Sequence, residues 1–182
     1  MKTLVIGDIH GCYDEMLQLI EKADMQPGDQ IIAVGDIIDR GPKSKEAIQY
    51  FIEHKNAQSI LGNHERKHIK GYRQAKIKSS KETNEHPPTF KLSMSQLIAK
   101  YQMGEEFYQH ALDYMQTLPL YIELPDAYIF HGFFEPSIPL ENQEEKTLVG
   151  VLSADFYLKN KYEEPWYSLY DGEKPAICGH ID

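Results

Sequence analysis

Three short polar motifs, each placed directly after an apolar run, restrict the fold of this chain more than any other feature. The apolar runs cover residues 3–6, 30–34 and 57–61 and have the length of buried strands. Between them, residues 13–23 and 44–55 carry apolar side chains at helical spacing. This strand–helix–strand–helix–strand order favours right-handed crossovers and a mainly parallel sheet. Because ligands of such sheets gather at the carboxyl ends of the strands, we expect the three motifs to share one site.

The motifs concentrate carboxylate, amide and imidazole groups beside one guanidinium. They read Gly-Asp-Ile-His-Gly at 7–11, Gly-Asp-Ile-Ile-Asp-Arg-Gly at 35–41 and Gly-Asn-His-Glu at 62–65. In an extended segment Asp8 and His10 point to the same side. Asp36 can bridge two cations because each carboxylate oxygen has separate lone pairs. Oxygen and imidazole ligands beside a fixed cation are what two-metal hydrolysis of a phosphate ester requires.

The sequence resembles the phosphoprotein-phosphatase family of calcineurin-like metallophosphoesterases, in particular its bacterial branch of Ser/Thr phosphatases and diadenosine tetraphosphatases. That family carries GDxHG, GDxxDRG and GNHE in this order, followed by two isolated His residues that each adjoin Gly. Here the last two are His131-Gly132 and Gly179-His180. The resemblance implies an α/β fold: a metallophosphoesterase-type β-sandwich of two mixed sheets flanked by helices, with an N-terminal βαβαβ unit. The length of 182 residues fits one domain with its own core, so we expect a single domain over residues 1–182.

The resemblance further implies which residues hold metal. Two divalent ions would share the carboxylate of Asp36. One ion would be bound by Asp8, His10 and Asp36, and the other by Asp36, Asn63, His131 and His180. Mixed oxygen and nitrogen ligands suit Mn²⁺, Fe or Zn²⁺ better than Ca²⁺, and we expect Mn²⁺.

Catalytic roles follow from the resemblance in the same way. Arg40 would bind the substrate phosphate together with Asn63 and His64. His64 would act as the general acid that protonates the leaving oxygen, and Asp39 would orient and charge its imidazole. The remaining acid of the third motif, Glu65, is more simply explained as a first-turn residue favoured by the helix dipole, so we leave it out of the site.

Residues 64–68 read His-Glu-Arg-Lys-His and therefore also match H-E-x-x-H, the zinc-protease motif. That motif needs a helix that is already under way, whereas His64 directly follows a strand end and Gly62-Asn63. We therefore interpret His68 as solvated or structural, as we do His54, His86 and His110. On this interpretation His68→Ala should change little.

Composition excludes several classes of partner. The net charge is −9 and only three basic residues are Arg, so a polynucleotide is a poor partner. No stretch approaches the ~20 apolar residues of a membrane-spanning helix, and no signal-peptide region precedes the first strand, so neither a membrane nor secretion is expected. Two cysteines, Cys12 and Cys178, exclude a disulfide scaffold and favour a reducing cytoplasm. We expect both to be small buried residues, with a disulfide or a redox-sensitive thiol as alternatives.

The rest of the chain is less regular. Residues 76–91 are polar and contain Pro87-Pro88, which predicts a mobile loop or cap. Residues 120–130 predict a hairpin, and residues 176–178 a short strand that delivers His180. Residues 92–103 and 105–116 are expected to be helices, with inner faces at Leu92, Met94, Leu97 and Ile98 and at Phe107, Ala111, Leu112 and Met115.

Two departures from the family pattern bear on substrate and extent. The family commonly has a second phosphate-binding Arg between its last two metal His residues, but residues 132–179 contain only lysines as cations. The same segment is rich in aromatic residues, which could stack a nucleobase, accept a peptide, or simply pack a second sheet. Relatives also usually continue past the Gly-His motif, so C-terminal strands of the second sheet are expected to be missing here. A natural short form, a truncated chain and an incomplete sequence all fit this ending.

Taken together, these features predict a binuclear metal-dependent phosphoesterase that hydrolyses phosphate monoesters with metal-activated water. The first choice is a Ser/Thr phosphoprotein phosphatase-like enzyme that acts on a phosphorylated protein or peptide, or on a small phosphate ester. The alternative is a bis(5'-nucleosyl)-tetraphosphatase acting on a dinucleoside polyphosphate, because the same metal core serves both activities. A second alternative is a weakly active phosphate-binding regulatory module.

Overall fold

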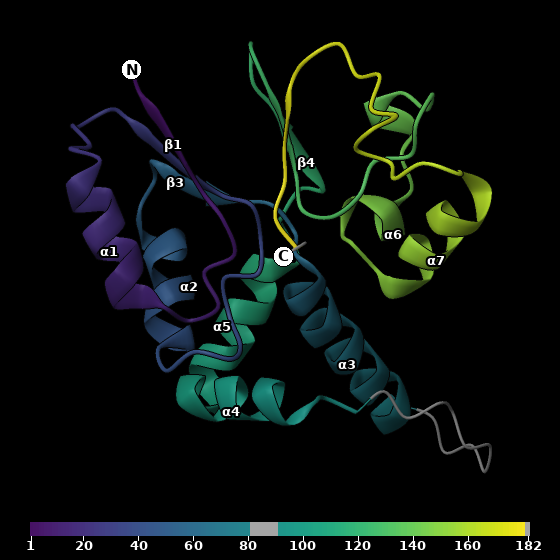
Figure 1. Ribbon diagram of the computed structural model, residues 1–182. Coiled ribbons are helices and arrows are strands. Elements are labelled where there is room, and N and C mark those ends of the chain that lie inside the picture. The colour runs from purple at the N-terminus through teal and green to yellow at the C-terminus, as the bar shows by residue number, and fades with distance from the viewer. Residues whose placement is uncertain (81–90, 181–182) are drawn as a thin grey trace.

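The computed structural model describes residues 1–80 and 91–180 and shows a parallel sheet built by the N-terminal third of the chain (Figure 1). Strands β1 (Thr3–Ile6), β2 (Gln30–Ala33) and β3 (Ala57–Ser59) lie in the order β1-β2-β3. Helices α1 (Tyr13–Lys22) and α2 (Ser44–Glu53) connect them. Val5 pairs with Ile32, and Ile32 with Gln58. The predicted βαβαβ unit is confirmed, and its described strands are all parallel because each connection is a helical crossover.

The second sheet is mixed. Strands β4 (Tyr121–Glu123) and β5 (Tyr128–Phe130) form the predicted hairpin, and β6 (Ala176–Ile177) pairs with β5 in parallel. Between β5 and β6 lie a short 3₁₀ helix (Leu140–Asn142) and helices α6 (Glu145–Leu148) and α7 (Leu152–Lys161). In Figure 1 this green-to-yellow segment lies on the opposite side of the molecule from α1 and α2.

The side chains of β2 point alternately to the two faces of its sheet, which explains why the two sheets pack face to face. Ile31 and Ala33 point toward the helices and join a cluster that includes Phe51 of α2. The intervening Ile32 points the other way and packs with Ile129 of the second sheet. Each fully buried side chain of this size contributes about 1.5–3 kcal/mol. A strand buried on both faces therefore reads as a continuous apolar run, which is how the sequence presents it.

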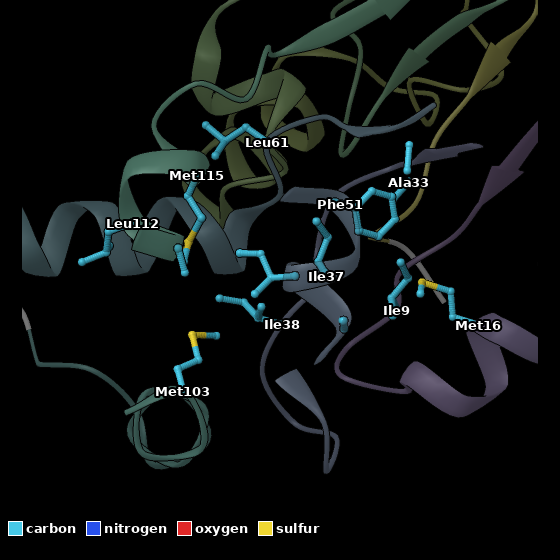
Figure 2. Packing of buried hydrophobic residues seen from close by; sticks show 14 of the residues in the cluster. Ile9, Met16, Ala33, Ile37, Ile38, Phe51, Leu61, Met103, Leu112 and Met115 are labelled. Atoms are coloured by element: carbon cyan, nitrogen blue, oxygen red, sulfur yellow. The ribbon is translucent and has the colours of Figure 1, made fainter. Parts of the chain in front are cut away.

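Helices also support the loop that follows β2. Figure 2 shows Ile37 and Ile38 of this loop directed toward Met103, Leu112 and Met115. These three come from α4 (Met94–Met103) and α5 (Glu105–Met115), while α3 (Asn63–Ser80) begins at the third motif. Ile37 and Ile38 lie between Asp36 and Asp39 in the sequence, so their burial anchors the polar second motif to the core.

Both predicted helices at 92–116 are present, but the inner face expected for the first was wrong. Met94, Leu97 and Ile98 are 72%, 48% and 50% exposed. The buried positions of α4 are Gln96, Ala99 and Met103. The reason is the N-terminal capping box, in which the Gln96 side chain turns back to accept the Ser93 N–H and so joins the inner face.

Two further expectations, for residues 76–80 and for the two cysteines, were wrong. The loop or cap expected at 76–91 was wrong for residues 76–80, which continue α3; residues 81–90 lie outside the described part of the chain. Cys12 and Cys178 are free and exposed, so neither burial nor a disulfide is found. Among the described residues, no helix has both the length and the apolar composition to cross a membrane.

Candidate metal centre

The six residues predicted to bind metal follow strands of both sheets, and the side chains of five of them converge there: Asp8, His10, Asp36, His131 and His180. Asp8 and His10 follow β1, Asp36 follows β2, and Asn63 follows β3; His131 and His180 follow β5 and β6. Backbone hydrogen bonds tie the loops together: the His10 N–H donates to the Asp36 carbonyl at 2.8 Å and the Gly179 N–H to the His131 carbonyl at 3.0 Å. The His180 N–H donates to Asp8 Oδ1 at 3.2 Å, so segments near the start and the end of the chain meet at the site.

Asp36 lies at the centre of this cluster. Its Oδ2 is 3.7 Å from His10 Nε2 and 3.5 Å from His131 Nε2. It is common to two groups of ligand atoms that lie within 4.8 Å of one another, His10–Asp36–His64 and Asp36–His131–His180. Ligand atoms that each lie about 2.1 Å from one ion are themselves roughly 3–4 Å apart. The geometry therefore gives Asp36 the place that a bridging carboxylate would take.

Unpartnered buried atoms test whether these residues fit metal ions. Among the described residues, His10 Nε2, His131 Nε2 and Asn63 Oδ1 are buried without a hydrogen-bond partner. Each such atom costs about 1–3 kcal/mol unless something satisfies it. The Nδ1 atoms of the two histidines face the Ile38 and Val34 carbonyls at 3.1 and 2.7 Å. This arrangement directs both Nε2 atoms into the cluster, as metal-binding histidines require, so the residues fit divalent cations.

The electrostatics of the cluster also favour a cation. Burial alone would raise the pKa of Asp36, but the neighbouring His131 and His64 outweigh burial and lower it to about 2. Burial alone would lower the pKa of His131, but Asp36 and Asp8 raise it to about 9. Burial lowers the pKa of His180. The carboxylates therefore hold positive charge at this point, a role that a divalent cation would take over with release of a proton.

The residues proposed for catalysis lie beside the cluster. His64 Nδ1 is 2.6 Å from Asp39 Oδ2, and both side chains are buried. The other ring nitrogen, Nε2, is 3.4 Å from Arg40 Nη2 and 4.0 Å from Asp36 Oδ2. Arg40 is exposed, so its guanidinium can reach a ligand from solvent. The structure thus places an imidazole and a fixed cation side by side, next to the ligand groups.

His68 belongs to the same hydrogen-bonded network, which the sequence did not reveal. Its Nε2 is 2.9 Å from Asp39 Oδ1 and its Nδ1 is 2.9 Å from the Tyr108 hydroxyl. It is fully buried, so of the two alternatives expected for it, solvated or structural, the solvated one was wrong. The available signal was its spacing of four residues from His64, which puts both on one face of α3. The two histidines flank one carboxylate rather than one metal, which removes the zinc-protease interpretation.

Glu65 is the second residue that sequence analysis undervalued. It is fully buried and accepts N–H groups from Asp36 and Ile37 at 2.9 Å each, from Gly62 at 3.2 Å and from Ile38 at 3.3 Å. Burial raises its pKa to about 7, whereas these donors favour its charged form. Glu65 therefore joins the start of α3 to the second motif and fixes the loop that carries Asp36.

The backbone is strained at the same place. Seven described residues other than Gly have positive φ, and five of them are in the site: His10, Asp36, Asp39, Arg40 and His180, with φ between 47° and 73°. Such conformations cost on the order of 1–3 kcal/mol each and persist only where the surroundings enforce them. The close approach of Gly62 to the Asp36 side chain, where a Cβ would collide, is one such constraint.

A cavity of about 530 Å³ opens beside His180. Its walls are largely aromatic or apolar and come from α7, the segment that follows it, and the loop after β5. Its polar residues are Asp155, Lys159, Glu163 and Glu164, and its aromatic residues are Phe133, Tyr162, Trp166 and Tyr167. Of the four lysines in residues 132–179, only Lys159 lines this cavity.

Comparison with known proteins agrees with the family expected from the motifs. A family model described as calcineurin-like phosphoesterase matches residues 1–181. The symmetrical bis(5'-nucleosyl)-tetraphosphatase of Neisseria meningitidis serogroup A (strain Z2491) is 32% identical over 179 residues, which are 97% of this chain and 58% of that protein. The enzyme of the same name from Shewanella sediminis is 31% identical over 164 residues, 87% of this chain and 54% of that protein. The chain therefore spans somewhat more than half the length of these relatives.

Solved structures show the same fold. One assigned as a diadenosine tetraphosphatase matches 98% of this chain and 74% of its own with a TM-score of 0.68 at 21% identity. A Ser/Thr phosphatase from Saccharomyces cerevisiae with similarity to human PP5 matches 78% of this chain and 42% of its own, with a TM-score of 0.53 at 22% identity. The family predicted from the motifs is thus confirmed, and the chain belongs to the calcineurin-like phosphoesterases.

Proposed function

We propose that this chain carries the catalytic site of a symmetrical dinucleoside tetraphosphate hydrolase that uses two divalent ions, most suitably Mn²⁺. The observation that carries the proposal is the cluster of ligand atoms around Asp36, in which His10 Nε2 and His131 Nε2 are buried without a hydrogen-bond partner among the described residues. The substrate class is supported by relatives named symmetrical bis(5'-nucleosyl)-tetraphosphatase. This reverses the order reached from sequence alone, where the Ser/Thr phosphatase stood first and the tetraphosphatase was the alternative.

The proposed reaction adds one water across a phosphoanhydride bond. Symmetrical cleavage breaks one P–O bond of the anhydride bridge that joins the second and third phosphorus atoms. The water oxygen bonds to one of these phosphorus atoms and the bridging oxygen leaves with the other, which yields two nucleoside diphosphates. Divalent ions, when bound, would supply an activated water and neutralise charge on the phosphoryl oxygens. Asp8, His10, Asp36, Asn63, His131 and His180 are the residues that would hold them.

The remaining residues act on the substrate itself. Arg40, with its exposed guanidinium, would hold the phosphoryl oxygens and stabilise the charge that develops on them. His64 Nε2, beside Arg40, would donate a proton to the leaving phosphate oxygen. Asp39 holds the opposite ring nitrogen, so the imidazole keeps its orientation.

Turnover of competing substrates by the Mn²⁺-loaded protein tests this proposal. Diadenosine tetraphosphate should be hydrolysed to ADP alone, with higher kcat/KM than a phosphoserine peptide or p-nitrophenyl phosphate. Asp36→Asn should abolish turnover, whereas Asp126→Asn, at an exposed carboxylate of the β4–β5 turn, should not. Faster hydrolysis of the peptide would restore the Ser/Thr phosphatase interpretation. Tight binding of Mn²⁺ and phosphate without turnover of any of the three would indicate the regulatory module.

A further inference from the structure

The cavity beside His180 adjoins the metal centre directly. His180 lines the cavity and also belongs to the Asp36–His131–His180 group of ligand atoms. Its ring packs edge-on against Phe133, another cavity residue, with centroids 5.4 Å apart. A phosphate bound at the metal centre would therefore have this cavity as its neighbour on the His180 side.

We propose that this cavity is a nucleobase subsite, in which Trp166 and Tyr167 form an aromatic corner that holds the adenine of the substrate. The inference rests on the proposed function, because it names the part of the substrate that lies beyond the phosphates. It also accounts for residues that the chemistry of the metal centre leaves unused.

The shape of the cavity suits a flat, rigid ring system. The Trp166 and Tyr167 rings have centroids 6.0 Å apart and an interplanar angle of 78°, so they meet as two walls of a corner. Tyr167 is 64% exposed, which leaves its ring available to a ligand. Trp166 packs on its other side against Phe130 at 5.9 Å, so the corner is fixed to the core of the second sheet. A volume of about 530 Å³ lies within the usual range for small-molecule sites.

The charges around the cavity favour the base over the phosphates. Apart from His180, the lining carries three carboxylates, from Asp155, Glu163 and Glu164, and one lysine. That lysine, Lys159, is paired with Asp155 at 2.8 Å. Carboxylates repel phosphate but accept hydrogen bonds from an exocyclic amine. Adenine presents such an amine on an uncharged ring, so the base would occupy the cavity while the phosphates stay with the metal ions and Arg40.

Tryptophan fluorescence gives a direct test because Trp166 is the only Trp of the chain. The matched probes are ADP and methyl diphosphate, which share the diphosphate but differ in the nucleoside. With Mn²⁺-loaded protein, ADP should quench the fluorescence and methyl diphosphate should not. As inhibitors of p-nitrophenyl phosphate hydrolysis, ADP should be about 5- to 150-fold the stronger, the range that stacking of one base provides.

Tyr167→Leu should bring the ratio of the two inhibition constants toward one. The matched control is Tyr101→Leu, at a tyrosine of α4 that is 89% exposed and outside this cavity; it should leave the ratio unchanged. Equal inhibition by the two probes in the unmodified protein, without quenching by ADP, overturns the inference. A stronger quench by an arginine-flanked phosphopeptide would also overturn the inference. It would indicate that the carboxylates of the cavity bind a basic peptide.

The same measurements separate this inference from the proposed function. Quenching and selective inhibition by ADP without hydrolysis of diadenosine tetraphosphate would uphold the subsite and reject the activity. Hydrolysis of diadenosine tetraphosphate with no preference for ADP over methyl diphosphate would do the reverse.

Discussion

The two sides of the metal centre are built in different ways. On one side, the loops after β1, β2 and β3 hold their side chains through short-range motifs, strained backbone and buried acceptors such as Glu65 and Asp39. On the other side, residues 133–179 contribute aromatic rings, exposed ion pairs and a cavity, with few buried polar groups. We infer that the first side carries out the reaction, and that the second side determines which group attached to the phosphate is recognised.

If this division holds, substitutions on the first side should abolish activity on every substrate, whereas those on the second should change the preference among substrates. The strongest test is a pair of Asp→Asn variants. Asp36→Asn removes the carboxylate shared by both ligand groups and should lower kcat/KM about 10³-fold or more for any phosphate substrate. Asp155→Asn, in the cavity, should alter only the ratio between nucleotide and p-nitrophenyl substrates. Steady-state kinetics with Mn²⁺ titration checks both, and a uniform loss in Asp155→Asn would contradict the division.

Glu65→Gln should be the most costly change for stability. The carboxylate accepts N–H groups from Asp36, Ile37, Ile38 and Gly62, whereas an amide offers one oxygen and turns its own N–H₂ toward donors. We expect a loss of about 2–5 kcal/mol in the free energy of unfolding, measured by denaturant titration of the metal-free protein. Glu46→Gln, an exposed first-turn acid of α2, is the control and should cost less than about 0.5 kcal/mol. Equal effects would mean that Glu65 is only a helix-dipole residue.

His68 should matter through Asp39, contrary to what its sequence position suggested. His68→Ala removes one of the two imidazoles on that carboxylate and should lower kcat by about 10–100-fold, the range seen when a supporting hydrogen bond is lost. The loss should be larger for phenyl phosphate, whose leaving group needs a proton, than for p-nitrophenyl phosphate. His68→Gln, which can still donate to Asp39, should restore most of the difference. A loss that is the same for both leaving groups would make His68 purely structural.

The chemical side of the site was predictable because its residues are contiguous in sequence with the strands that position them. Asp8, Asp36 and Asn63 stand at strand ends, and a parallel sheet brings strand ends together. What the motifs could not show is where Asp39 directs its second oxygen, because that depends on α3 and α5 packing together so that His68 and Tyr108 meet. The role of Glu65 was not predicted for a related reason: a first-turn acid and a buried acceptor of four N–H groups look the same in sequence.

The other side was less predictable because tertiary packing decides it. Aromatic residues at 133–166 fitted both ordinary packing and a binding wall, and the structure places some of them in core clusters and others at the cavity. Phe130 and Phe134 are buried in a core cluster, while Trp166 and Tyr167 border the cavity. The same ambiguity affected α4, where apolar residues at helical spacing turned out to face solvent because Gln96 sets the inner face.

The smallest effect expected is a pH dependence that comes from the cavity side alone. Glu135, in the loop after β5, anchors α7 by accepting hydrogen bonds from Lys161 at 2.5 Å and the Tyr157 hydroxyl at 2.9 Å. Burial alone would raise its pKa, but Lys161 and Tyr157 lower it below the ordinary value of 4.5. A carboxyl whose pKa is lower in the folded state stabilises the fold above its ordinary pKa, and this contribution is lost as pH falls through the folded-state pKa. Glu135→Gln should therefore have a lower Tm than the unmodified protein at pH 6, and the gap should shrink as pH falls below about 4.5. The difference between the two melting curves isolates this group from the other carboxylates, which both proteins share. A gap that stays constant down to acid pH would show that α7 is held by apolar packing, and that the cavity does not depend on this ion pair.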